Sequence, residues 1–311
     1  MKPLLIILGP TASGKTHLAT QIAHQMGGEI ISVDSRQVYR NMNIGTGKDL
    51  DEYRVNGNNI PYHLIDIKEA GEQYNVNEFQ KDFKRTYDDL AEGNSVPILC
   101  GGTGFYIYAL LKGHAFSSIP VDNDLRIKLE IHTTEELNHI FQNLNSAYSG
   151  LADTSTRKRL IRAIEISQYL IQNPSSGSKL VTTSVKYQSV IFGLNPPVDV
   201  RRERISSRLK YRLENGLIDE VEALMKSGIS AEQLIYYGLE YKFVTQFLLG
   251  ELIYKDMARS LESEIHRFAK RQMTFFRKME KDGITINWIN HDLPLTEQIE
   301  MITGKYNKIL V

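Results

Sequence analysis

Four residues near the start of the chain fill the fixed positions of a phosphate-binding pattern. The pattern GxxxxGK[ST] is matched by Gly9, Gly14, Lys15 and Thr16, with an apolar run before it and helical periodicity after it. In such a loop the glycines let backbone amides approach an anion, the lysine adds a positive charge, and the threonine hydroxyl is placed for Mg²⁺. The pattern predicts a site for a diphosphate group, but it does not say which bond near the phosphates is broken.

Two more candidates for chemistry follow apolar runs. Asp34 comes directly after a short β-branched run at 29–33, and Thr103 lies in the glycine-rich segment after the run at 96–100. Ligands bind beyond the carboxyl ends of the strands in open α/β sheets, so Asp34 is a site candidate by position as well as by chemistry. Glycines around Thr103 would let the backbone approach a ligand, although a turn without a ligand is the alternative at that point.

The elements that must position these residues alternate between strands and helices. Apolar residues at helical spacing predict helices over 15–26 and 76–92. Strand character is found at 3–8 before the loop, returns at 189–194, and a last strand is expected at 284–289. We therefore expect an α/β fold with a P-loop-type core, in which helices flank a mainly parallel sheet.

Residues 114–186 differ from the rest because they have little strand signal. This stretch is predicted to be an all-helical insertion, and the core continues on either side of it, over 1–113 and 187–311. Inside the insertion, helices are expected over 125–132, 135–144 and 155–171, followed by a flexible break over 173–178. In the second part of the core, helical patterns cover 199–215, 234–249 and 261–279.

Basic residues gather locally in a chain whose formal net charge is zero. Any contact with nucleic acid must therefore come from local patches. One cluster, within a single predicted helix of the insertion, consists of Arg157, Lys158, Arg159 and Arg162. A solvated helix face is the alternative for this cluster. A second series recurs at steps of three and four residues and shares one helix face that could clamp an anion: Arg201, Arg204, Arg208 and Arg212.

The single cysteine, Cys100, excludes an intramolecular disulfide and a thiolate metal cage. It fits a reducing, cytoplasmic setting, and at the end of an apolar run it is interpreted as a small buried residue without a catalytic role. No run reaches the roughly 18 apolar residues that a bilayer-spanning helix needs. We therefore expect neither export nor membrane insertion.

Seven motifs, in this order along the chain, closely resemble those of the tRNA dimethylallyltransferases. They lie at 9–16, 34–39, 45–48, 62–66, 101–106, 159–165 and 269–274, so the resemblance covers essentially the whole chain. The resemblance implies transfer of a dimethylallyl group from dimethylallyl diphosphate to the exocyclic amine of the adenosine 3′-adjacent to the anticodon of tRNA. Diphosphate is then the leaving group, and the implied cofactor is Mg²⁺.

The resemblance also implies roles for individual residues. Asp34 matches the family's catalytic aspartate, a candidate base for the adenine amine, and Thr103 matches a threonine near the reacting centre. The diphosphate would be held by Gly9, Thr11, Ala12, Ser13, Gly14, Lys15, Thr16 and Arg208, with Mg²⁺ at Thr16. The flipped adenosine and its neighbours would be contacted by Asp34, Ser35, Arg36, Gln37 and Thr103. The RNA backbone would be held by Arg126, Lys158, Arg159 and Arg162.

Three alternatives remain open at this point. A nucleotide kinase or other NTPase would also use the loop, with Asp34 binding a metal at a strand end. An adenylate isopentenyltransferase would keep the prenyl donor but use a free nucleotide as acceptor. A non-catalytic RNA-binding module would explain the basic patches but leave the loop and Asp34 without a role. The expected partners are the tRNA anticodon stem-loop and dimethylallyl diphosphate, and the expected state is a monomer.

Overall fold

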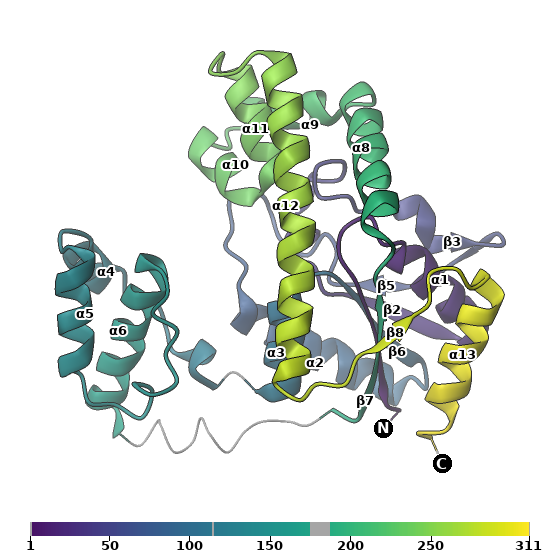
Figure 1. Cartoon of the computed structure of the whole chain (residues 1–311), viewed down its shortest axis with the longest axis horizontal. Helices are drawn as coiled ribbons and strands as arrows, with labels where there is room; N and C mark the ends of the chain where they lie inside the picture. The colour runs from purple at the N-terminus through teal and green to yellow at the C-terminus, as the bar shows by residue number, and fades with distance from the viewer. Residues whose placement is uncertain (1, 114, 175–186, 311) are drawn as a thin grey trace. The chain divides into compact units, whose positions relative to one another are not determined.

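The computed structural model describes residues 2–113, 115–174 and 187–310. The chain divides into two compact units, one made of Met1–Tyr108 and Tyr187–Val311 and the other of Ala109–Lys186 (Figure 1). The sequence placed the insertion at 114–186, and both ends of that range lie outside the described residues. The division in the structure falls inside helix α3 (Gly104–Lys112), which neither glycine nor proline interrupts after its first residue.

One parallel sheet forms the centre of the first unit. Its six strands run in the order β5-β2-β6-β1-β7-β8, and each neighbouring pair is parallel. All five residues of β1 are buried, as expected for a parallel sheet covered on both faces. The α/β fold with a mainly parallel sheet is therefore confirmed. The strands are β1 Leu4–Leu8, β2 Gly28–Ser32, β5 Tyr62–His63, β6 Val96–Gly101, β7 Ser189–Leu194 and β8 Asn287–Ile289.

Helices cover the sheet on both sides (Figure 1). Helix α1 (Lys15–Met26) and helix α13 (Leu295–Asn307) share one hydrophobic cluster with alternate residues of β1, Leu5 and Ile7. The Tyr306 hydroxyl of α13 donates a hydrogen bond of 2.8 Å to the Pro3 carbonyl, which fixes the C-terminal helix beside the first strand. Helix α2 (Val76–Glu92) begins at an Asn75 capping box and packs against β2 and β6.

Small elements fill the connection between β2 and α2. They are the 3₁₀ turn η1 (Leu50–Tyr53) and an antiparallel pair formed by β3 (Arg54–Val55) and β4 (Asn58–Asn59). Tyr53 and Val55 join the hydrophobic cluster beneath α1, so the connection is held against the core rather than left in solvent.

A run of helices follows β7 in the first unit. They are α8 Val198–Glu214, α9 Leu217–Lys226, α10 Ala231–Tyr237, α11 Leu239–Leu248 and α12 Tyr254–Lys281. The prediction of one helix over 234–249 was wrong, because Gly238 adopts φ 146° and ψ −174° and separates α10 from α11. Helix α12 starts earlier than the predicted 261–279 and packs against both α8 and α11. Helices α3 and α13 were not predicted.

The regular elements of the second unit are all helical in its described part, residues 109–113 and 115–174. Its elements are the 3₁₀ turn η2 (Ala115–Ser118) and helices α4 (Asn123–Glu130), α5 (Thr134–Asn143) and α6 (Arg157–Gln172). They enclose a core of Leu129, Leu137, Leu160, Ile161 and Ile164. Of the predicted break at 173–178, residues 175–178 lie outside the described chain. In the described parts of both units, no helix combines the length and apolar composition that crossing a bilayer requires.

Candidate active site

Three strand ends bring the predicted chemical residues to one edge of the sheet. Leu8 is in register with Gly101, and Ser32 with Cys100, so β1, β6 and β2 end at the same level. The phosphate loop, Thr103 and Asp34 follow these ends directly. The Ser35 amide donates to Thr103 Oγ1 at 3.3 Å, and the Thr103 amide donates to the Val33 carbonyl at 3.2 Å. The two predicted catalytic residues are therefore carried on directly hydrogen-bonded segments.

The phosphate loop, residues 9–14, has the backbone of an anion cradle. Gly14 has φ 86°, and Ala12 also has a positive φ of 59°, a backbone conformation typical of loops whose amides bind an anion. A Cβ atom at Gly9 would lie 2.6 Å from Ser13 Oγ and 2.8 Å from the Leu194 carbonyl, which requires glycine there. Helix α1 starts at Lys15 without a side-chain cap, and Ser13 Oγ is buried with no hydrogen-bond partner among the described residues. Both features leave donors for an anion.

Several ionisable groups lie near Lys15. Its side chain is half-buried, and loss of solvation lowers the pKa of its ammonium group. The positive charge of Arg208 also lowers this pKa, whereas Cys100 and Asp34 act in the opposite direction. Lys15 therefore lies within electrostatic reach of both the predicted diphosphate clamp and the predicted base. A bound diphosphate would favour the charged ammonium and so act against the effect of burial.

The arginine series on α8 divides among different partners. Arg212 is buried and pairs with Asp49, with Nη2 at 3.0 Å from Oδ1, whereas Arg208 Nη1 is 3.8 Å from Asp49 Oδ2. Both guanidinium groups lie against Gly47. A Cβ atom at that position would come within 2.5 Å of Arg208 Nη2. Burial, and then Arg212, lower the pKa of Arg208. Arg208 is thus a partly desolvated cation with a distant carboxylate, which suits a ligand anion.

Arg204, the next member of the series, lies nearer the phosphate loop. Its Nη1 atom would be 4.0 Å from a Cβ atom at Gly14. Arg201, one step further toward the start of α8, points elsewhere and bonds to Asn195. The single clamping face expected from the spacing is therefore split, and Arg204 and Arg208 are its members closest to the loop and Lys15.

Asp34 is held in one orientation by the backbone that follows it. Its Oδ1 atom accepts hydrogen bonds from the amides of Arg36 at 2.8 Å and Gln37 at 3.3 Å. Within the described chain, Oδ2 has no hydrogen-bond partner, and the side chain is half-buried. One carboxylate oxygen is therefore fixed and the other can accept a proton, as a general base requires.

The neighbours of Asp34 differ in how far their side chains are occupied. Gln37 Oε1 accepts from Ser32 Oγ at 2.9 Å, and Gln37 Nε2 donates to the Gly47 carbonyl at 2.9 Å, so both ends of this amide are used inside the fold. The Arg36 guanidinium carbon lies 5.1 Å from the centre of the exposed Tyr236 ring. Of these two residues predicted to contact RNA, Arg36 is therefore the one whose side chain is available for such a contact.

Gln272 on α12 connects the elements of this site, and no role was predicted for it. Its Oε1 atom accepts from the Thr11 amide at 2.8 Å, and its Nε2 atom donates to the Gly102 carbonyl at 3.0 Å. The amide thus links the phosphate loop to the segment before Thr103. Gln272 lies in the matched motif at 269–274, which was the only signal in the sequence that could have pointed to it.

Two glutamates near the arginines were also not foreseen. Burial raises the pKa of Glu52, and Asp49 raises it further, while His17, Arg208 and Lys15 lower it. Burial likewise raises the pKa of Glu240, against the effect of Arg212 and Arg208. Both glutamates raise the pKa of Arg208, so they lie near its guanidinium group. Neither of them is within ion-pair distance of that group.

A metal at this edge would have to rely on the ligand as well as on the protein. No group of three or more acidic, histidine or cysteine side chains in the described residues is arranged to hold a metal ion. Thr16, the predicted Mg²⁺ residue, lies in the first turn of α1, next to the loop amides. Mg²⁺ commonly keeps waters and binds through one or two protein groups plus substrate phosphates, so a hydroxyl at this position fits the ion.

In the helical unit, most of the predicted RNA-binding cations have partners within the unit. Arg126 Nε and Nη2 each lie 2.8 Å from an oxygen of Glu165, whose side chain is 1% exposed. Arg162 Nη1 is 3.3 Å from Glu165 Oε2, and its Nη2 donates to the Ile119 carbonyl at 2.6 Å. Arg159 pairs with Asp153 at 2.7 Å. Lys158 is exposed and forms no ion pair with any described residue.

Fold and site define a P-loop-type α/β enzyme with a helical unit inserted into its core. The model of the family described as IPP transferase matches residues 37–279, and that of isopentenyl transferase matches residues 2–63. The chain therefore belongs to the IPP transferase family. Enzymes of this family transfer prenyl groups, and the present chain is accordingly a prenyl-transferring enzyme.

Curated relatives and solved structures agree with this assignment. The chain is 50% identical over 297 residues to tRNA dimethylallyltransferase 1 of Parabacteroides distasonis, covering 95% of each chain. It is 48% identical to tRNA dimethylallyltransferase 1 of Porphyromonas gingivalis, covering 97% of this chain and 99% of the relative. The solved tRNA isopentenylpyrophosphate transferase of Bacillus halodurans matches with a TM-score of 0.70 and 32% identity, over 99% of this chain and 98% of the other. These likenesses support the predicted prenyltransferase over the kinase and free-nucleotide alternatives.

Proposed function

We propose that this enzyme moves a dimethylallyl group from dimethylallyl diphosphate to the exocyclic amine of the adenosine 3′-adjacent to the anticodon in tRNA. The observation that carries the proposal is the shared strand edge, where the phosphate loop, Lys15 and Arg208 lie near Asp34 and Thr103. The relatives named above carry the tRNA dimethylallyltransferase name, which supports the choice of donor and of nucleic acid.

In this reaction the bond between the allylic carbon and the diphosphate oxygen breaks, and both electrons leave with the diphosphate. Loop amides, Lys15 and Arg208 would stabilise the negative charge that develops on the leaving group. Thr16 would hold a Mg²⁺ ion through its hydroxyl, and the bound ion would supply further stabilisation of the developing negative charge.

On the acceptor side, a bond forms between the adenine nitrogen and the allylic carbon, and the nitrogen loses one proton. Asp34 would take that proton on the carboxylate oxygen that the backbone does not occupy. Thr103, which accepts from the Ser35 amide, would position the reacting groups. The target base is stacked in the anticodon loop and must be flipped out to reach this edge, at a cost of a few kcal/mol.

Contacts to the RNA are proposed for both units. Ser35, Arg36 and Gln37 would face the flipped adenosine and its neighbours, and the cations of the helical unit would contact the backbone. Exposed Lys158 and Arg159 are the better candidates there, because Arg126 and Arg162 are engaged by Glu165. The monomeric state and the cytoplasmic setting stay predictions.

A labelling assay tests this function. The enzyme is incubated with labelled dimethylallyl diphosphate and unmodified tRNA, and the label is then located by nuclease digestion. We expect label in tRNA on the adenosine that follows the anticodon, and little label in AMP offered at the same concentration. Hydrolysis of ATP without transfer of label would support the kinase alternative, and equal labelling of AMP would support the free-nucleotide alternative.

A further inference from the structure

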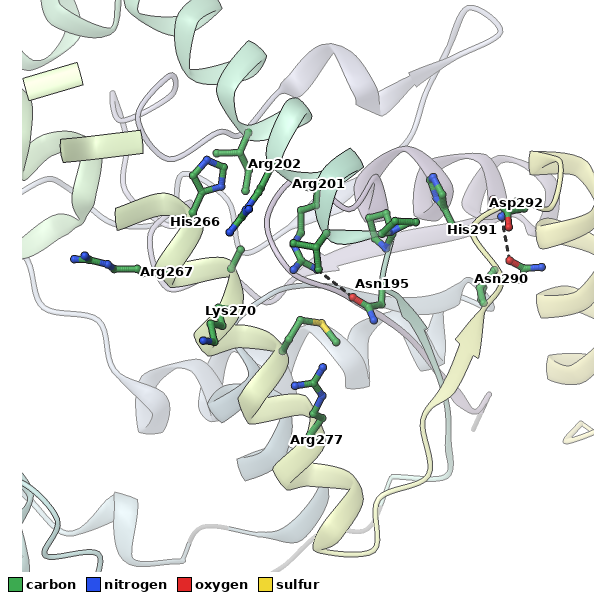
Figure 2. Close-up of a pocket in the computed structure, with 17 residues that line it drawn as sticks. Asn195, Arg201, Arg202, His266, Arg267, Lys270, Arg277, Asn290, His291 and Asp292 are labelled. Atoms are coloured by element: carbon green, nitrogen blue, oxygen red, sulfur yellow. Dashed lines mark hydrogen bonds between the residues drawn. The ribbon is translucent and has the colours of Figure 1, made fainter. Parts of the chain in front are cut away.

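A cavity of about 790 Å³ lies in the first unit, outside the ends of β7 and β8 (Figure 2). It is lined by the start of α8, by one side of α12 and by the segment after β8, and none of its lining residues belongs to the phosphate loop, to Asp34 or to Thr103. The reaction proposed above therefore assigns no role to these lining residues. What the cavity can bind depends on its own side chains.

Positive charge dominates the lining. The cationic side chains are Arg201, Arg202, Arg267, Lys270 and Arg277, with His266 and His291, against a single acidic residue, Asp292. In the part of the chain that the structure describes, Arg267 pairs with Glu264, but no carboxylate lies within ion-pair distance of Arg201, Arg202 or Arg277. Such a concentration of uncompensated charge is unusual in a protein whose formal net charge is zero.

Arg201 is the most informative of these residues. It is 8% exposed, and its Nη1 atom donates to the neutral amide oxygen of Asn195 at 3.1 Å. A guanidinium carries five N–H donors, and a buried one normally has a carboxylate partner. Burial, and then Arg202 and Arg277, lower the pKa of Arg201. In Figure 2, Arg201 from α8 and Arg277 from α12 point toward the same space, Arg202 lies next to Arg201, and Arg267 points away.

The backbone adds to the attraction for an anion. Asn195, Pro196, Pro197 and Val198 line the cavity and lead into α8, a helix of 17 residues. Its N-cap is Pro197, and no side chain caps its first amides. The positive end of the helix dipole therefore opens toward the same space as the three arginines.

The remaining walls are apolar. Ile205, Met273, Ala269 and Ile289 line the cavity beside the charged groups. Volume and walls together exceed what a lone phosphate needs, and they suit an anion attached to an organic group. We propose that this cavity is a second binding site, separate from the phosphate loop, for the diphosphate group of a small organic diphosphate.

The test uses full-length protein carrying Lys15→Ala, in which loss of the ammonium group weakens binding at the phosphate loop. Isothermal titration calorimetry with ADP, dimethylallyl diphosphate and inorganic diphosphate should still show one binding site. We expect the organic diphosphates to bind more tightly than inorganic diphosphate, because only they reach the apolar walls. The tighter of the two organic probes identifies the source of the diphosphate group, and a failure of the proposed prenyl transfer would leave this result unchanged.

Adding Arg201→Leu should weaken binding at least about tenfold, because a charge-assisted contact to the anion is lost. Exposed Arg277→Gln should weaken it as well, so the conclusion does not depend on the buried variant alone. The matched control is Arg259→Leu, an exposed arginine of α12 outside the cavity, which should change nothing. Absence of binding in the Lys15→Ala protein, or binding that is insensitive to Arg201 and Arg277, would overturn the proposal. Displacement of each probe by tRNA would also overturn it and assign the arginines to RNA.

Discussion

The strand edge of the core and helix α6 of the helical unit both carry cations at positions that the sequence singled out, yet they use them differently. At the edge, Lys15 and Arg208 are partly desolvated, and Arg208 is 3.8 Å from its nearest carboxylate. On α6, Arg162 shares the buried carboxylate of Glu165 with Arg126. The cations at the strand edge are therefore available to bind a ligand, whereas much of the positive charge on α6 forms ion pairs that stabilise the helical unit.

The largest effect is expected at the edge, from Lys15→Ala. Loss of the ammonium group removes charge stabilisation from the departing diphosphate, so turnover should fall about 10³-fold, or roughly 4 kcal/mol. Single-turnover transfer of label to tRNA measures this directly. The matched control is Lys158→Ala on α6, which should keep its chemical step. A wild-type rate in Lys15→Ala would remove the loop from the reaction.

The next effect is expected from Asp34→Ala, which should lower turnover at least about a hundredfold because the proton acceptor is lost. The affinity for tRNA should change little, since Asp34 Oδ1 bonds only to the local backbone of Arg36 and Gln37. Pre-steady-state rates and tRNA binding are measured on the same protein. Unchanged turnover would refute the role of the base, and a matching loss of tRNA affinity would make Asp34 a binding residue.

On α6 the corresponding substitution is expected to lower the stability of the fold. Glu165→Gln leaves Arg126 and Arg162 without their buried carboxylate, so the free energy of unfolding should fall by about 2 kcal/mol, a value reduced for the partial exposure of Arg126. Urea denaturation followed by circular dichroism measures it, with Glu135→Gln on the exposed surface of α5 as control. Equal stability of the two variants would mean that the α6 charges are not structural.

The smallest effect separates the cations within α6. Lys158→Ala should flatten the dependence of log Kd for tRNA on log salt by about one unit, because one phosphate contact is lost. Arg162→Ala should lower stability and change this slope less, since its guanidinium donates to the Ile119 carbonyl. Filter binding at several salt concentrations provides both slopes. The reverse order would assign Arg162, not Lys158, to the RNA.

Local signals predicted most of the framework. Helices α1 and α2 have the bounds expected from periodicity, because glycines or an asparagine cap mark their ends in the sequence, and strand β7 also has its expected bounds. The break between α10 and α11 was missed, since Gly238 lies in an otherwise helical pattern and only its backbone, at a positive φ that favours glycine, separates them. Helix α13 was missed although Leu295, Ile299, Ile302 and Tyr306 recur at helical spacing; what the sequence does not show is that this stripe packs on Leu5 and Ile7, far away in the chain.

Which cations have a carboxylate partner also depends on contacts between residues that lie far apart in the sequence. The phosphate loop and Asp34 could be predicted because the pattern and the strand ends are local. Nothing local shows that Glu165 lies against Arg126, 39 residues earlier, or that Gln272 reaches the Thr11 amide, 261 residues away. Spacing thus predicts where cations gather, and the fold decides which of them a ligand can use.

One titration tests this distinction most directly. Dimethylallyl diphosphate is titrated by calorimetry into a protein carrying Arg201→Leu, which weakens the cavity site, and into the same protein with Arg208→Leu or Arg159→Leu added. We expect Arg208→Leu to weaken binding at least about tenfold and exposed Arg159→Leu to leave it unchanged. Equal affinities in all three proteins, or a loss confined to Arg159→Leu, would contradict the assignment of the strand edge as the diphosphate site.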